Sequence, residues 1–161
     1  MANNLRHRHG EQLLCRYAVD SAQVIEVGDL VWLNTDDVRP ATAYTWDTDL
    51  ATTQASFAAV FVGVAQEASA NGETAEISVD ISPMSVYEMA CASATFECGD
   101  NVGPDQTGTG SSATMMDQTV EAATGTSSIG HVVKRVTSAA TVVEVQFSSS
   151  VFGNNVNAVI G

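Results

Sequence analysis

The feature that most constrains the fold is an internal repeat. Three short motifs of the first half of the chain recur in the same order in the second half, at 27–31 and 98–102, at 62–65 and 129–132, and at 77–81 and 143–147. Gly28 recurs as Gly99 and Gly63 recurs as Gly130, so the order is kept while the loop lengths change. Self-similarity at a roughly constant separation is the sequence signature of a repeated structural unit. We therefore expect two related halves; the alternative is chance recurrence in a chain rich in Val and Gly.

The pattern within each half is that of half-buried β-strands. Apolar and polar residues alternate along 75–82 and again along 142–148. In the first of these segments Ile77, Val79 and Ile81 fall on one face. A period of two with one apolar face is typical of antiparallel strands that cover a core on one side.

Turns and loops separate the expected strands. The dipeptide Asn71-Gly72 lies between the apolar segment 61–65 and the alternating segment, and it is a strong signal for a β-hairpin. Helical periodicity is hard to find, so the polar segments 41–55 and 103–114 are expected to be long loops.

These patterns predict an all-β fold made of two related small β-barrel or sandwich halves with an extended N-terminal arm. The expected division is an arm at 1–18, a first half at 19–90, a second half at 91–153 packed with the first, and a C-terminal tail at 154–161.

Charge is distributed unevenly between the arm and the body. The chain has 6 Lys and Arg against 19 Asp and Glu, a net charge of −13. Within 1–16, Arg6, Arg8 and Arg16 face a single acid, Glu11, so the arm is slightly basic and the remainder is strongly acidic. Binding to nucleic acid needs clustered cations, so we predict no nucleic-acid partner. No apolar run approaches the roughly 20 residues that cross a membrane, so we predict no membrane partner.

The sequence offers little chemistry. The candidate bases are His7, His9 and His131, and no Gly-x-Ser-x-Gly motif accompanies them. The three cysteines lack the short spacing of a zinc site. We therefore predict a protein that is not an enzyme, with no cofactor and no metal.

Three segments of the first half carry a family resemblance. They read Val-Ile-Glu-Val-Gly-Asp-Leu-Val-Trp-Leu at 24–33, Val-Phe-Val-Gly-Val-Ala-Gln-Glu-Ala at 60–68 and Gly-Glu-Thr-Ala-Glu-Ile-Ser-Val at 72–79. Together they resemble the capsid decoration, or cement, proteins of tailed bacteriophages, in which a Gly-Asp-x-Val strand precedes a Val-Gly-Val-Ala strand and an alternating strand. The resemblance is looser in 98–147, where Asn101 and His131 depart from the pattern.

The resemblance implies a virion structural protein, made in the host cytoplasm and located on the outer surface of an icosahedral head. The resemblance also implies that the protein forms a homotrimer, binds the major capsid protein and bridges neighbouring capsomers. Its contact residues would come from the arm, with Trp46 in a polar loop as a lesser candidate, because Trp is enriched at contact hot spots. The arm residues in this set are Leu5, Arg6, Arg8, Leu13, Leu14 and Tyr17.

Three alternatives remain open at this stage. The arm could fold back onto its own domain, and Trp46 could pack in the core. The protein could instead be a receptor- or glycan-binding module of a head fibre or adhesin. That second function predicts that the loops 41–55 and 103–114 converge on one ligand-facing end.

Overall fold

The alternating segments form strands in the computed structural model, which describes residues 7–152. Leu5 and Arg6, and the expected tail at 154–161, lie outside the described residues. The elements, in chain order, are β1 (His7–His9), β2 (Leu14–Val19), β3 (Leu30–Asn34), β4 (Asp37–Pro40), η1 (Ala41–Ala43), α1 (Leu50–Val60), β5 (Phe61–Ala65), β6 (Ile77–Asp80), β7 (Val86–Phe96), β8 (Asn101–Thr107), η2 (Gly110–Ser112), β9 (Thr114–Ala122), η3 (Gly125–Ser127), β10 (Gly130–Val132) and β11 (Val136–Phe147).

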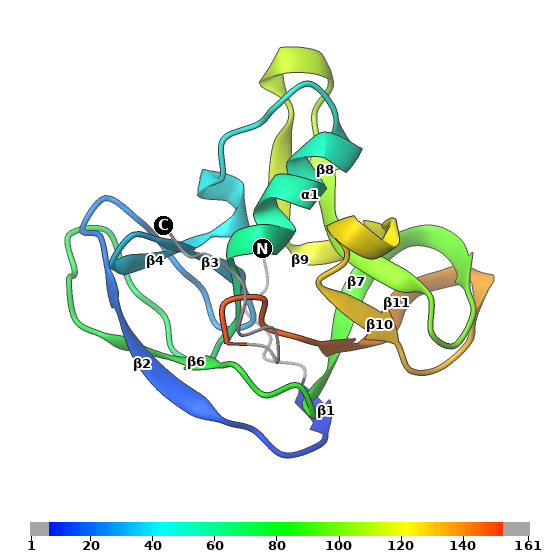
Figure 1. Cartoon of the computed structure of the whole chain (residues 1–161), viewed down its shortest axis with the longest axis horizontal. Helices are drawn as coiled ribbons and strands as arrows, with labels where there is room; N and C mark the ends of the chain where they lie inside the picture. Colours follow the sequence, from blue (N-terminus) through cyan, green and yellow to red (C-terminus); the bar gives the residue numbers. More distant parts are fainter. Residues whose placement is uncertain (1–6, 153–161) are drawn as a thin grey trace.

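The strands form two closed barrels, which confirms the all-β fold with two related halves. The first barrel has the order β2-β4-β3-β5-β6, and the second has the order β7-β11-β10-β8-β9, closed by a pairing of β7 with β9. β1 lies outside the second ring and pairs antiparallel with β7. Figure 1 shows the first barrel on the left, the second on the right and α1 above their junction.

The two barrels have the same topology. In the first barrel β2 pairs in parallel with β4 and antiparallel with β6. In the second barrel β7 pairs in parallel with β9 and antiparallel with β11. The expected pairing of β5 with β6 is also present, and so is its counterpart, the pairing of β10 with β11.

The repeated Gly-Asp turns match at the level of single hydrogen bonds. Gly28 N donates to Ala65 O at 2.8 Å, and Gly99 N donates to Val132 O at 2.8 Å. Both glycines have positive φ angles, 96° and 89°, which other residues adopt only with strain. The motif recurrence in the sequence therefore reflects a duplicated structural unit.

The sequence predicted a long loop over 41–55, and this prediction is wrong in part. The helix α1 begins at Leu50, inside that segment. Asp49 caps the helix by accepting a hydrogen bond from Thr52 N at 2.8 Å. The helix has no clear apolar stripe, because its buried face includes the polar residues Thr53 and Gln54. Gln54 Nε2 donates to Pro104 O of the second barrel at 2.9 Å, which satisfies a buried amide. The helix escapes detection in the sequence because polar side chains fill positions where apolar ones are expected.

One hydrophobic core extends across both barrels. It joins Phe57 and Phe61 of the first half to Tyr87 and Phe147 of the second half. The Phe61 and Phe147 ring centroids lie 5.9 Å apart. A second cluster, which includes Val31, fills the interior of the first barrel alone. The halves are therefore packed together rather than linked as independent units.

The chain passes between the barrels three times. Residues 10–13 run from β1 on the second barrel to β2 in the first, and residues 81–85 run back from β6 to β7. After β11 the chain returns to the first barrel, where Ser150 N donates to Phe61 O at 3.0 Å. Leu14 belongs to β2, a strand of the first barrel, although the sequence analysis assigned it to the arm. The expected boundary between the two halves, at 90/91, falls inside β7.

Candidate contact surface

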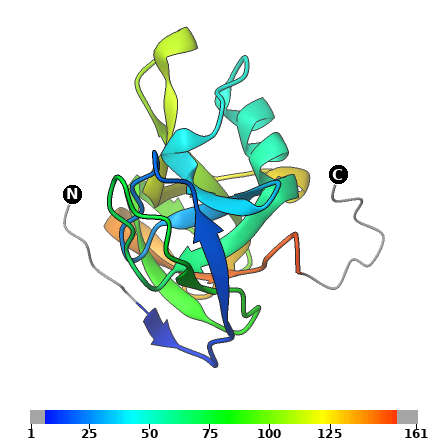
Figure 2. The same ribbon diagram turned by 90° about the vertical axis from the view of Figure 1, so that its left-hand side faces the viewer.

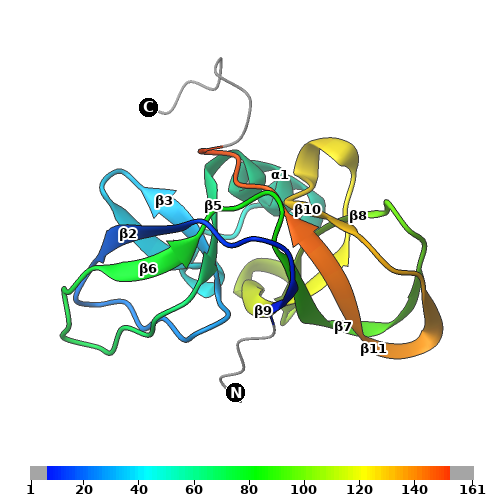
Figure 3. The same cartoon turned by 90° about the horizontal axis from the view of Figure 1, so that it is seen from below.

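The N-terminal strands form a continuous ribbon with the strands that link the barrels. β1 pairs antiparallel with β7, where the register shifts between His7 and His9, and β2 pairs antiparallel with β6, where Leu14 lies opposite Asp80. Between them, Ile81 N donates to the carbonyl oxygen of Leu13 at 2.9 Å. We call residues 10–14 and 80–85 the connecting ribbon. Figure 3 shows it as blue and green segments that run side by side between the barrels.

A buried polar network holds the connecting ribbon to both barrels. The Tyr87 hydroxyl donates to Asp80 Oδ2 at 2.6 Å and accepts from Gln66 Nε2 at 2.8 Å and from Gln12 Nε2 at 3.0 Å. Asp80 Oδ1 accepts from the Leu13 amide at 3.0 Å. Burial, together with the hydrogen bond that it donates to Asp80, raises the pKa of Tyr87 far above its usual value. The hydroxyl therefore stays protonated as a hydrogen-bond donor.

Glycine allows the ribbon to pass close to its neighbour. A Cβ atom on Gly10 would lie 1.9 Å from the carbonyl oxygen of Met84, and Gly10 has a φ of 95°. Beyond this point the carbonyl of Glu11 accepts hydrogen bonds from the hydroxyls of Ser82 and Ser85. The connecting ribbon is thus fixed by both its backbone and its side chains.

Large apolar side chains of the connecting ribbon face solvent. The exposed fractions are 54% for Leu13, 51% for Leu14 and 61% for Met84. Scattered exposed apolar residues are normal on a protein surface. Here, however, three of them occur on the two paired segments of the connecting ribbon, which a buried network holds in place. Met84 was not expected as a contact residue, because nothing in the sequence places 84 beside the arm.

The other arm residues already have partners within the chain. The Arg8 guanidinium pairs with the carboxylate of Glu88 on β7. The Tyr17 ring lies 5.8 Å from the Phe152 ring, measured between centroids, and packs against the core of the first barrel. These contacts are those of an arm that folds back on its own domain.

Trp46 is half-buried rather than presented to solvent. It packs against the core shared by the barrels, and its buried Nε1 has no hydrogen-bond partner among the described residues. The neighbouring aromatic rings of Trp32 and Tyr44 meet edge to face at 4.9 Å. Of the expected contact residues that the structure describes, Leu13 and Leu14 are the large apolar side chains exposed on the connecting ribbon.

The two polar segments of the sequence lie on the same side of the molecule. The segment between η1 and α1 and the hairpin formed by β8 and β9 project together in Figure 2. Thr42 N and Thr42 Oγ1 both donate to the carboxylate of Asp117, at 2.7 and 3.0 Å. The segment 103–114 is not one long loop, contrary to the prediction from the sequence, because 103–107 belongs to β8 and Thr114 begins β9; only the residues between them form the end of the hairpin.

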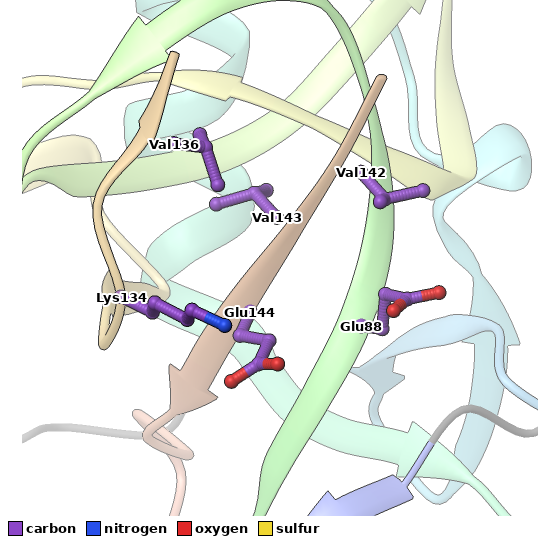
Figure 4. A pocket seen from close by; sticks show the side chains of 6 residues that line it. All are labelled: Glu88, Lys134, Val136, Val142, Val143 and Glu144. Carbon is purple, nitrogen blue, oxygen red and sulfur yellow. The ribbon is translucent and has the colours of Figure 1, made fainter. Parts of the chain in front are cut away.

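A shallow depression of about 190 Å³ lies on the outer face of β7 and β11. Figure 4 shows Lys134 beside Glu144, with valine side chains at the other end. Glu144 also lies 3.8 Å from His9 Nε2 of β1. The depression is small, its lining includes both valine and charged side chains, and Glu88 in that lining pairs with Arg8 of β1.

Known proteins and site patterns provide no further identification. No protein-family model matches this chain, and no curated protein is significantly similar to it in sequence. Among residues 7–152, no three His, Cys, Asp or Glu side chains are grouped so that they could hold a metal ion. In the same range no helix has the length and apolar character needed to cross a membrane.

Proposed function

We propose that this chain is a structural protein of a virus particle. In this proposal it is a capsid decoration protein that binds the outer surface of an icosahedral head, bridges neighbouring capsomers and stabilises the shell. The observation that carries the proposal is the exposed apolar group of Leu13, Leu14 and Met84 on a ribbon held by both barrels. The family resemblance of the Gly-Asp and Val-Gly-Val-Ala segments supplies the kind of partner.

The physical requirements of a cement protein fit this arrangement. A bridging protein must transmit force without deforming, and three chain crossings with one shared core resist separation of the barrels. Burying each of the half-exposed side chains at a partner would contribute about 1 kcal/mol. Such a contact is weak for one copy. Many copies on one shell, each engaging more than one capsomer, add up to a large stabilisation.

The test is binding of the purified protein to mature, undecorated heads of its virus, measured by co-sedimentation. The wild-type chain is expected to sediment with the shells, and the double variant Leu13→Ser/Leu14→Ser is expected to bind at least tenfold more weakly. The matched control is Val24→Ser, because Val24 is 53% exposed but lies outside the connecting ribbon. Absence of wild-type binding across a range of salt concentrations would refute the proposed function. If the double variant binds as well as the wild type, the connecting ribbon is not the contact surface.

We further propose that the protein assembles as a homotrimer, which gives a three-fold particle for the three-fold positions of a head. Native mass spectrometry tests this directly. A species with three times the mass of the chain is expected, and a monomer at micromolar concentration would contradict the trimer.

A second candidate function is recognition of a receptor or glycan by a head-fibre or adhesin module. The observation in its favour is that the segments 41–55 and 103–114 lie on one side of the molecule, where Thr42 also binds Asp117 of β9. This function predicts binding to a glycan array by the isolated protein without affinity for heads. Binding to heads with no glycan signal would favour the first candidate.

A further inference from the structure

The hairpin of β8 and β9 is attached to the first barrel through two neighbouring residues of β9. The carboxylate of Asp117 accepts two hydrogen bonds from Thr42, one from its amide and one from its hydroxyl. Gln118 Nε2 donates to Asp29 Oδ1 at 2.8 Å and to the Val27 carbonyl at 3.3 Å. We call these four contacts the inter-barrel joint.

The inter-barrel joint buries a carboxylate that the duplicated turn normally exposes. In the first barrel Glu26 N donates to Asp29 Oδ2 at 2.8 Å, and in the second barrel Glu97 N donates to Asp100 Oδ2 at 2.8 Å. Asp100 is exposed to solvent. Asp29 is only 3% exposed, because β9 covers it. The same local turn thus occurs once in water and once inside an interface.

No positive charge compensates the carboxylates of the joint. Glu26, Asp29 and Asp117 form no ion pair with any Lys, Arg or His in the described part of the chain. The arginines there pair elsewhere, namely Arg8 with Glu88, Arg16 with Glu67 and Glu76, Arg39 with Asp20 and Asp37, and Arg135 with Glu97.

The groups that surround Asp117 are therefore all acidic or neutral. Asp29 and Glu26 approach it from the turn before β3, and η1 contributes only Thr42. On the facing strand β8, the carboxyl of Asp105 interacts with Glu121 instead. The partial burial of Asp117 and the negative charges of Asp29 and Glu26 disfavour its ionised form, and binding a proton relieves the repulsion.

We propose that the inter-barrel joint is a proton-dependent latch, which is closed when Asp117 is protonated and weakened when Asp117 is ionised. Protonation does not cost the joint its hydrogen bonds. The Thr42 amide still donates to one oxygen of the acid, and the Thr42 hydroxyl accepts from the protonated oxygen instead of donating to it. Ionisation keeps the same contacts but adds repulsion from Asp29 and Glu26.

The expected pH range follows from the surroundings of Asp117. Burial, and then the negative charge of Asp29, raise the pKa of Asp117 to about 7, although its bonds from Thr42 oppose the rise. Burial also raises the pKa of Asp29 above its usual value. The latch is therefore expected to loosen as pH rises through neutrality, in a protein whose remaining surface is already strongly acidic.

The test is amide hydrogen exchange of Thr42 in the full chain at about pH 6 and about pH 8.5, corrected for the intrinsic change in exchange rate. Wild-type protection at Thr42 is expected to fall by about tenfold at the higher pH, and Asp117→Asn is expected to abolish that fall. Asp29→Asn should reduce the fall, because it removes the main repelling charge. The matched control is Asp100→Asn, which alters the equivalent exposed turn and should leave the fall unchanged.

Two results would overturn the latch. One is equal Thr42 protection at both pH values in the wild type. The other is an Asp117 carboxyl resonance that titrates near pH 4, as an ordinary aspartate does. If Asp117→Asn fails to fold, Asp29→Asn and the wild-type titration still decide the question. These measurements use the isolated protein, so their outcome is independent of whether the chain binds a capsid.

Discussion

The most informative stability experiment is the replacement Tyr87→Phe, which removes one oxygen atom from the network beneath the connecting ribbon. The ring remains, so its edge-to-face contact with His7 at 5.4 Å and its contact with Phe147 at 6.2 Å are preserved. What is lost is the hydrogen bond from the Tyr87 hydroxyl to Asp80 Oδ2. Asp80 is only 3% exposed, so water cannot easily replace the missing donor.

The magnitude follows from these contacts. A hydrogen bond to a charged group contributes about 1.5–3 kcal/mol, and leaving a buried acceptor without a donor adds to the cost. The two glutamine amides that donate to the hydroxyl lose less hydrogen-bonding energy, because Gln12 Nε2 also donates to Gln66 Oε1 at 3.0 Å. We expect Tyr87→Phe to lower the free energy of unfolding by about 3 kcal/mol.

Urea denaturation followed by intrinsic fluorescence provides the measurement. Tyr44→Phe is the matched control, because it removes a hydroxyl that interacts with the neutral side chain of Ser56. That control should cost about 1 kcal/mol or less. If Tyr87→Phe changes the free energy of unfolding by less than about 0.5 kcal/mol, or no more than the control, the network does not hold the ribbon and our reasoning fails.

Three further predictions concern backbone packing, charge and helix capping. Gly63→Ala should lower the free energy of unfolding by about 3 kcal/mol or more in urea denaturation, because its Cβ would lie 2.0 Å from the carbonyl oxygen of Asp80; Gly72→Ala, in open space but at a φ of 92°, should cost only about 1 kcal/mol. The folded chain holds the proton of Asp117 up to about pH 7, whereas the unfolded chain releases it near its usual pKa. The free energy of unfolding should therefore fall as pH rises through that window, by about 2 kcal/mol after allowance for partial solvent exposure, and Asp117→Asn should flatten this dependence in melts at several pH values. Asp49→Ala should lower the melting temperature through a loss of about 1 kcal/mol, since it removes the α1 cap, and a melting curve equal to the wild type would contradict that role.

The sequence alone predicted the parts of the fold that depend on local pattern. The recurrence of Gly28 and Gly63 at Gly99 and Gly130 correctly predicted a duplicated unit, because a turn with positive φ and a close backbone approach both demand glycine. The alternation in 75–82 and 142–148 correctly predicted strands whose apolar residues Val79, Val143 and Val145 are in the core, but in the first of these strands Asp80, on the opposite face, is buried as well.

The candidate site was only partly visible in the sequence. Leu13 and Leu14 were expected as contact residues and are exposed, but Met84 was not expected, although it lies on the adjoining strand of the same ribbon. Arg8, which was also expected at an external contact, pairs with Glu88 within the chain. A charge pattern cannot distinguish an external partner from an internal one, because both satisfy the same electrostatic attraction.

Local chemistry along the chain therefore determined that this protein is a pair of β units with glycine turns and an acidic surface. Only the tertiary structure decided how the units meet. The crossings of the chain, the shared aromatic core and the burial of Asp29 but not Asp100 all arise from contacts between residues far apart in sequence. Two copies of one motif carry equal local information, so the difference between their environments can come only from what packs against each of them.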